Sequence, residues 1–145
     1  MATDTFGDVY IAYYNEVAGW SGYTPNKFDS ERFQPASVAD KGFFLEFTRK
    51  TTSDHGHGSG GTELSVCEFE LNITRKIKGS TTFAADMQAI WDDLDTAEVE
   101  LNDLASSRGD VLMVSSITIE KIEGQVNWKH CKISGFVEWR RSIQT

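Results

Sequence analysis

Apolar residues recur at spacings of three and four near the N-terminus, the period of a helix with one apolar face. This stripe predicts a helix over about residues 5–18, with Asp4 or Thr5 as its cap and Gly19 at its end. Its members are Phe6, Val9, Tyr10, Tyr13 and Val17. We expect this face to pack against the rest of the protein.

A second and longer stripe of the same period predicts a helix over residues 83–105, capped by Thr81 or Thr82. No glycine or proline interrupts it. Its apolar members are Phe83, Met87, Ile90, Trp91, Leu94, Leu101 and Leu104. We expect Trp91 to lie in the core because it shares this stripe.

Four further stretches alternate apolar and polar residues, the period of a strand with one buried face. They lie at about residues 43–49, 63–77, 111–120 and 126–140. The element order is therefore α-β-β-α-β-β. Because both helical stripes need a surface to cover, we predict one α+β domain over residues 1–145, with two helices on one face of a four-stranded, mainly antiparallel sheet.

Length and composition agree with one globular domain. The chain has 145 residues, of which 39% are hydrophobic and 25% charged. No apolar run reaches the roughly 18 residues of a membrane span, and the first residues have neither the basic nor the apolar region of a secretory signal. We therefore expect a soluble intracellular protein without a membrane partner.

Charge is unevenly distributed along the chain. Residues 1–120 hold 9 basic and 20 acidic side chains, whereas residues 121–145 hold 5 basic and 2 acidic ones. Nucleic-acid binding depends on basic side chains that neutralise phosphates, whereas the acidic residues 1–120 repel them. The basic C-terminal segment suits contact with an acidic neighbour such as a second copy, and its candidate interface residues are Trp139, Arg140 and Arg141.

The second predicted helix carries many acidic side chains without an intervening lysine or arginine. We interpret such a run first as the solvated polar face of the helix, and a face selected for what it repels is the alternative. We treat it as a candidate acidic lumen or interface face. The residues that define this face are Asp92, Asp93, Asp95, Glu98, Glu100 and Asp103.

A glycine-rich loop lies between the first two predicted strands, at about residues 51–62. Ordering glycine costs the most backbone entropy, so we expect this loop to be mobile in the isolated chain. His55 and His57 can face one metal ion, but only Asp54 lies beside them as a third ligand. We therefore predict no metal site, and treat both histidines as candidate subunit-interface residues.

Cys67 and Cys131 are the only cysteines, and each lies on the apolar phase of a predicted strand. Two cysteines are too few for a zinc site, so we predict two buried free thiols. The sequence has no phosphate-binding glycine loop and no motif that pairs a nucleophile with a base. We therefore predict a protein that is not an enzyme and uses no cofactor.

Four segments of this acidic chain together resemble the tail-terminator family of long-tailed bacteriophages. They are Asp8-Val9-Tyr10-Ile11-Ala12-Tyr13, Lys41-Gly42-Phe43-Phe44-Leu45-Glu46-Phe47, Glu68–Ile77 and Phe136-Val137-Glu138-Trp139-Arg140-Arg141. The resemblance extends over nearly the whole chain through the shared element order.

The resemblance implies a non-enzymatic virion structural protein. Such a protein forms a homo-oligomeric ring, typically a hexamer, that caps the phage tail tube and stops its polymerisation. The ring also joins the tube to the head-connector or neck proteins, and DNA passes through it without specific binding. The implied location is the tail or neck of the virion, after assembly in the host cytoplasm.

Two other classes remain open from the sequence. One is another phage head–tail joining, tail-completion or tail tube subunit, because these proteins share small α/β or β-rich folds. The other is a small enzyme or ligand-binding α+β domain with a pocket between its helices and its sheet. The mass of the particle in solution separates a ring from a monomer with a cleft.

Overall fold

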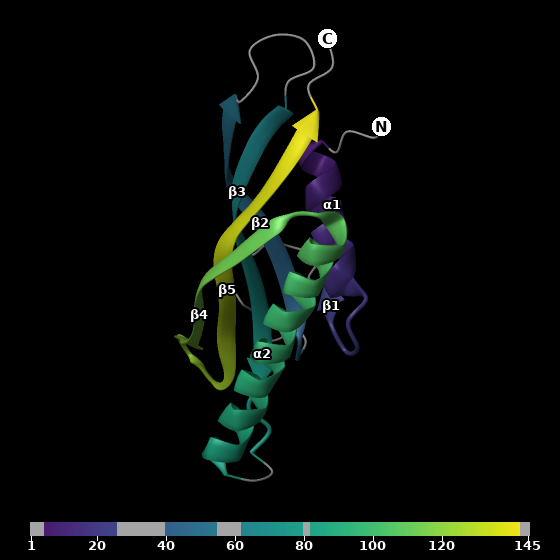
Figure 1. The fold of residues 1–145 in the computed structure, drawn as a ribbon. Coiled ribbons are helices and arrows are strands. Elements are labelled where there is room, and N and C mark those ends of the chain that lie inside the picture. Colours follow the sequence, from purple (N-terminus) through teal and green to yellow (C-terminus); the bar gives the residue numbers. More distant parts are fainter. Residues whose placement is uncertain (1–4, 26–39, 55–61, 80–81, 143–145) are drawn as a thin grey trace.

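The structure is a computed structural model that describes residues 5–25, 40–54, 62–79 and 82–142 (Figure 1). Two helices and one mixed sheet confirm the predicted α+β class. The elements follow in the order α1 (Phe6–Ala18), β1 (Thr24–Pro25), β2 (Gly42–Asp54), β3 (Thr62–Lys76), α2 (Phe83–Arg108), β4 (Val111–Ile122) and β5 (Gln125–Ser142).

The sheet has five strands in the order β1-β2-β3-β5-β4, rather than the four predicted. The pairs β2–β3, β3–β5 and β5–β4 are antiparallel, as expected. The additional strand β1 pairs parallel with β2, with Thr24 opposite Gly42 and Pro25 opposite Phe43. A two-residue strand is too short to show an alternating pattern, so apolar periodicity could not predict it.

Both helices begin and end at residues suited to capping. Thr5 and Asp8 form a reciprocal capping box at the start of α1, and Thr82 accepts a hydrogen bond from the backbone of α2. α2 ends at Gly109, whose φ of 78° lies in the left-handed region that glycine adopts without a steric penalty. The helix therefore extends to Arg108, three residues beyond the predicted end.

One hydrophobic core lies between the helices and a single face of the sheet. Both helices lie on the same side of the sheet in Figure 1, as the sequence predicted. Cys67 and Cys131 are fully buried free thiols in this core, which confirms their prediction. The largest fully buried side chains include Tyr13, Phe43, Leu71, Ile73, Ile90, Leu94 and Ile133.

Trp91 is 41% exposed, so its predicted place in the core is wrong. The buried positions of α2 are Ile90, Leu94, Ala97, Leu101 and Ala105. These are separated by three or four residues, whereas Trp91 follows Ile90 directly and is rotated about 100° around the helix axis. The aromatic ring therefore lies at the border of the apolar face rather than at its centre.

The segment between β2 and β3 is shorter than the glycine-rich loop predicted at residues 51–62. β2 continues to Asp54 and β3 begins at Thr62. Residues 55–61, with His55 and His57, lie outside the described residues. The two strands pair as far as Asp54 opposite Glu63, so the sheet extends almost to the base of the loop.

Candidate interaction site on the α2 surface

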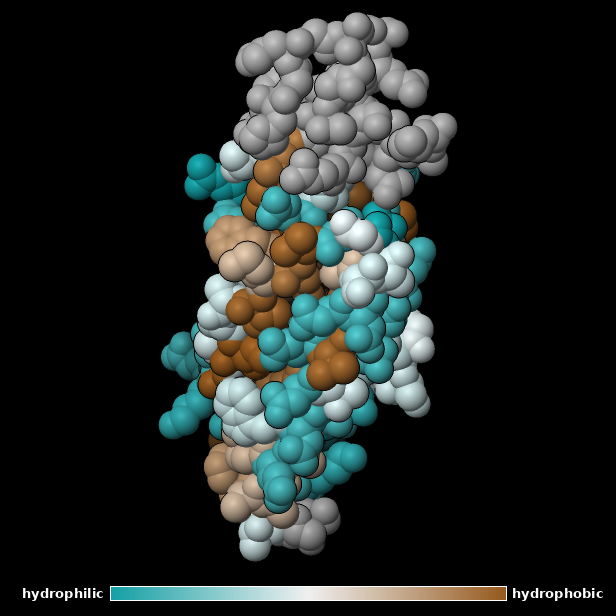
Figure 2. Space-filling model, viewed as in Figure 1, coloured by the Kyte–Doolittle hydropathy of each residue, from teal (hydrophilic) through white to brown (hydrophobic). Residues whose placement is uncertain are grey.

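Five of the six predicted acidic residues of α2 form no ion pair within the described residues. Figure 2 shows the outward surface of α2 as mainly hydrophilic, with hydrophobic surface beside it. This placement agrees with a solvated anionic face. The residues are Asp92, Asp95, Glu100 and Asp103, which are exposed, and Glu98, which is half-buried.

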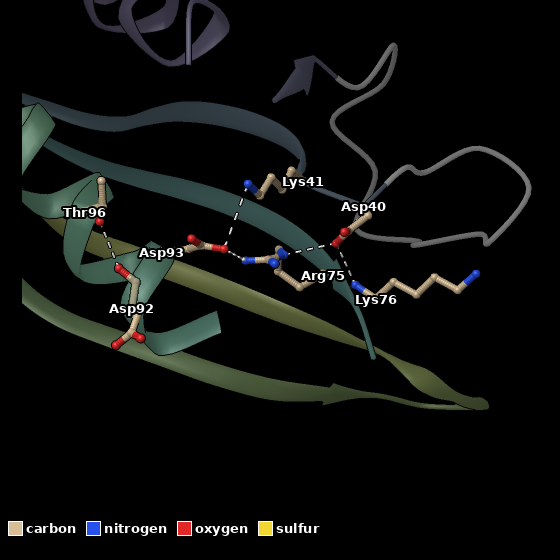
Figure 3. Close-up of polar contacts among 7 residues, drawn as sticks. All are labelled: Asp40, Lys41, Arg75, Lys76, Asp92, Asp93 and Thr96. Atoms are coloured by element: carbon tan, nitrogen blue, oxygen red, sulfur yellow. Dashed lines mark hydrogen bonds and ion pairs between the residues drawn. The ribbon is translucent and has the colours of Figure 1, made fainter. Parts of the chain in front are cut away.

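Asp93 differs from its neighbours because it belongs to an ion-pair network (Figure 3). Arg75 in β3 donates from Nη1 to Asp93 Oδ2 at 2.7 Å and from Nε to Asp40 Oδ1 at 3.0 Å. Lys41 Nζ lies 4.0 Å from the same Asp93 oxygen, and the backbone N–H of Lys76 donates to Asp40 Oδ1. The network thus joins α2, β3 and the residues that precede β2.

The guanidinium of Arg75 is only 7% exposed, so it depends on these carboxylates. Burial alone would lower the pKa of Arg75, but the hydrogen bond to Asp93 and the negative charge of Asp40 outweigh it and raise the pKa. Arg75 continues the core-facing phase of Leu71 and Ile73 in β3. A charged side chain on a buried phase needs a partner, and this is the signal that the sequence analysis missed.

An open pocket of about 320 Å³ adjoins the network between the end of α1 and α2. Trp20 and Tyr23 form one wall, with ring centroids 5.2 Å apart in an edge-to-face arrangement. The indole N–H of Trp20 donates to Glu16 at 2.7 Å and so orients the ring. The lining residues are Trp20, Ser21, Tyr23, Lys41, Asp93, Thr96, Ala97 and Glu100.

The pocket combines aromatic faces with carboxylates, the chemistry that binds organic cations. Lys41 already lies over the Tyr23 ring, with Nζ 5.5 Å from the ring centroid. Burial raises the pKa of Tyr23 to about 12, so the phenol remains neutral at physiological pH. In the sequence, Asp93 and Glu100 differ in no way from the other acidic residues of this helix, and no local pattern places Trp20, Tyr23 or Lys41 beside them.

The predicted C-terminal interface residues occupy different environments. Trp139 is 3% exposed and its ring centroid lies 6.1 Å from that of Phe6, so its side chain belongs to the core and is not an exposed contact. Arg140 and Arg141 lie in β5, where they pair with Leu64 and Glu63 of β3. Their side chains, like His55 and His57, are outside the described part of the structure.

The edge strand β4 presents an exposed apolar surface that the sequence analysis did not identify. Val111 is 51% exposed, Met113 61% and Phe136, which pairs with Met113 from β5, 38%. No charged residue occurs between Val111 and Ile119. Long edge strands without charged side chains are templates for pairing with another chain.

His130 lies on the sheet face opposite the core. Its Nε2 donates to Asn72 Oδ1 at 2.7 Å, and its Nδ1 is 3.8 Å from Glu120 Oε2. Burial lowers the pKa of His130, while Glu120 opposes that effect. Although this face of the sheet is opposite the core, the His130 side chain is only 14% exposed.

Comparisons of the chain with models of known families and with curated proteins give no match. No helix of the described residues is long and apolar enough to cross a membrane. Among the same residues, no group of three potential metal ligands is close enough to hold an ion.

Proposed function

We propose that the protein is a non-enzymatic, ring-forming tail terminator of a long-tailed bacteriophage. In this role the ring, as a hexamer, caps the tail tube, stops its polymerisation and joins it to the head-connector proteins. Its partners are further copies of itself, the tube protein and the neck proteins. Its location is the tail or neck of the virion, after assembly in the host cytoplasm.

The β4 edge is the observation that best supports self-assembly. Within the described residues, no strand pairs with its outer side, and the side chains of Val111 and Met113 on this strand are exposed and apolar. Soluble monomers usually protect such edges with charged residues, prolines or short strands. Pairing with a second copy would satisfy the backbone groups and cover the apolar side chains.

The acidic face of α2 supports the passage of DNA through a ring. Asp92, Asp95 and Asp103 are exposed and form no ion pairs within the described residues. Neighbouring like charges on a helix cost stability, so their retention fits a role outside the folded monomer. If this face lined a channel, it would repel the phosphates and let DNA move without binding.

The proposal is tested by measuring the assembly state of the purified full-length protein. Light scattering after size exclusion should give a discrete multiple of the 16.2 kDa chain, and electron microscopy should show rings. Added to polymerising tail tubes of the same phage, the protein should bind tube ends and stop growth. Open-ended tubes formed by the protein alone would instead identify a tube subunit.

The pocket beside Trp20 supports a second candidate, a small ligand-binding domain. Its volume of about 320 Å³ lies at the lower end of the range for small-molecule sites. If the protein stays monomeric at all concentrations and does not bind tube ends, the terminator function is excluded. Saturable binding of a small organic cation by that monomer would then favour the ligand-binding domain.

A further inference from the structure

We infer that the pocket lined by Trp20, Tyr23, Asp93 and Glu100 receives an arginine of the C-terminal Arg140-Arg141 pair from a second copy of the chain. This inference rests on the proposed ring and specifies one of its contacts. In this contact, the pocket of one copy binds the basic end of β5 of the next copy.

The charges and aromatic rings of the pocket suit a guanidinium. Its lining contains the carboxylates of Asp93 and Glu100 against the single ammonium of Lys41. Asp93 is already bound by Arg75, whereas Glu100 forms no ion pair within the described residues. A planar guanidinium can stack on Trp20 while it donates to Glu100, a combination that a lysine ammonium provides less well.

The same chain cannot place its own C-terminal arginines in the pocket. Arg140 pairs with Leu64 in β3, whereas Lys41 at the pocket donates its backbone N–H to Thr74, ten residues further along the same strand. Ten residues of a strand span about 33 Å. Figure 1 shows the C-terminal end of β5 far from β1.

The donor must therefore come from another copy. Pocket and donor are different surfaces of one chain, so the contact is head-to-tail, and repetition closes a ring where the rotation between copies permits it. Charge favours the pairing as well. Residues 121–145 carry 5 basic and 2 acidic side chains, whereas the rest of the chain carries 9 basic and 20 acidic ones.

The test compares two charge reversals on the same exposed side of α2 in the full-length protein. Glu100→Lys places a cation in the pocket, whereas Asp103→Lys makes the same charge change outside its lining. Sedimentation should show that Glu100→Lys raises the concentration needed for half-assembly at least about tenfold. Asp103→Lys should raise it less than about threefold, since an exposed charge outside the contact contributes little.

Two further variants remove ambiguity about charge and folding. Thr96→Phe fills the pocket without changing charge and should weaken assembly to a similar degree. Combining Glu100→Lys with Arg140→Glu and Arg141→Glu should recover part of the assembly that each change alone removes. Thermal melting of every variant checks that the monomer remains folded, as expected for exposed positions.

The results distinguish a failure of the pocket contact from a failure of the proposed ring. If Glu100→Lys assembles like the wild type, or if both lysine variants weaken assembly equally, the pocket does not receive the arginine and the ring proposal remains. If the wild-type protein is monomeric at every concentration, both the contact and the ring are wrong.

Discussion

Arg75 lies on the buried phase of β3, where a guanidinium is tolerated only with anionic partners. Asp93 and Asp40 provide them from α2 and from the segment before β2, at 2.7 and 3.0 Å. Arg75 thus joins β3 to α2 and to the segment before β2, and its partner Asp93 also lines the aromatic pocket. Adjacent Asp92, of the same residue type, is exposed, and its backbone carbonyl accepts a hydrogen bond from Thr96 (Figure 3).

Replacing Asp93 by Asn should destabilise the protein more than replacing Asp92 by Asn. The first change leaves a nearly buried guanidinium with Asp40 alone, at a cost of about 1–3 kcal/mol. The cost stays below that of a fully buried pair because Asp93 is 37% exposed. Asp92→Asn should change stability by less than about 0.5 kcal/mol. Urea unfolding measures both, and equal effects would show that the network contributes no stability.

His130 should make stability depend on pH near neutrality. Burial lowers its pKa in the folded state, so the unfolded chain binds more protons once the pH falls below its ordinary pKa of about 6.5. His130 contributes fully to the free energy of unfolding above that pH. This contribution decreases as the pH falls toward the lower pKa of the folded state. Wild type should therefore lose more stability between pH 7.5 and 5.5 than His130→Gln.

The matched variant isolates this residue because His55 and His57 are present in both proteins. Charged groups near His130 act in different directions: Glu120 and Glu70 favour the protonated ring, while Lys132 disfavours it. If wild type instead gained stability relative to His130→Gln at acidic pH, the attraction of Glu120 at 3.8 Å would outweigh burial.

At the scale of elements, β4 and β5 meet through an irregular register. Val114 pairs with Gly135 and Ser116 with Ser134, so Ser115 is an additional residue that bulges from β4. The bulged backbone passes close over Gly135. A Cβ atom at Gly135 would overlap the Met113 carbonyl oxygen and lie 2.9 Å from Val114 Cα. Only glycine fits this position without a shift of the edge strand.

Gly135→Ala should therefore destabilise the protein by about 1–3 kcal/mol, because a methyl group must displace backbone rather than a mobile side chain. Ser134→Ala is the matched control on the neighbouring position and should cost less than about 1 kcal/mol. Urea unfolding gives both values. A Gly135→Ala protein as stable as the control would mean that β4 readily moves away from β5.

At the scale of the whole molecule, the described residues offer other chains further surfaces besides the aromatic pocket. The β4 edge is apolar, the outer face of α2 is acidic, and the end of β5 is basic by sequence. These surfaces differ in chemistry and in position, as a head-to-tail assembly requires. Helices and sheet already enclose one core, so the monomer folds without using them.

Met113→Lys should weaken self-association while leaving the monomer folded. A charge on an edge strand opposes pairing with another strand, and the Met113 side chain is already 61% exposed. The expected effect is at least about a tenfold rise in the concentration for half-assembly, measured by sedimentation. Val126→Lys is the control, since Val126 is 88% exposed at the other end of the hairpin. Equal effects of both variants would exclude the β4 edge as the contact.

Local pattern determined most of the fold. Capping residues and apolar spacing placed α1 and α2, and alternation placed four strands, because these signals act between residues close in the chain. Their order predicted the α+β class and the single core. Sequence likewise identified the acidic residues of α2, but it treated Asp93 and Glu100 like the others in the run.

Tertiary structure alone decided what those local signals could not encode. The parallel pairing of β1 with β2 joins residues 18 positions apart, and Arg75 meets Asp40 across 35 positions. Rotation of α2 against the sheet placed Trp91 at the border of the core, whereas the burial of Trp139 follows the alternating apolar phase of Cys131, Ile133 and Val137 in β5. The first three outcomes depend on which distant surfaces meet, because burial and partnering are properties of the packed chain rather than of any one segment.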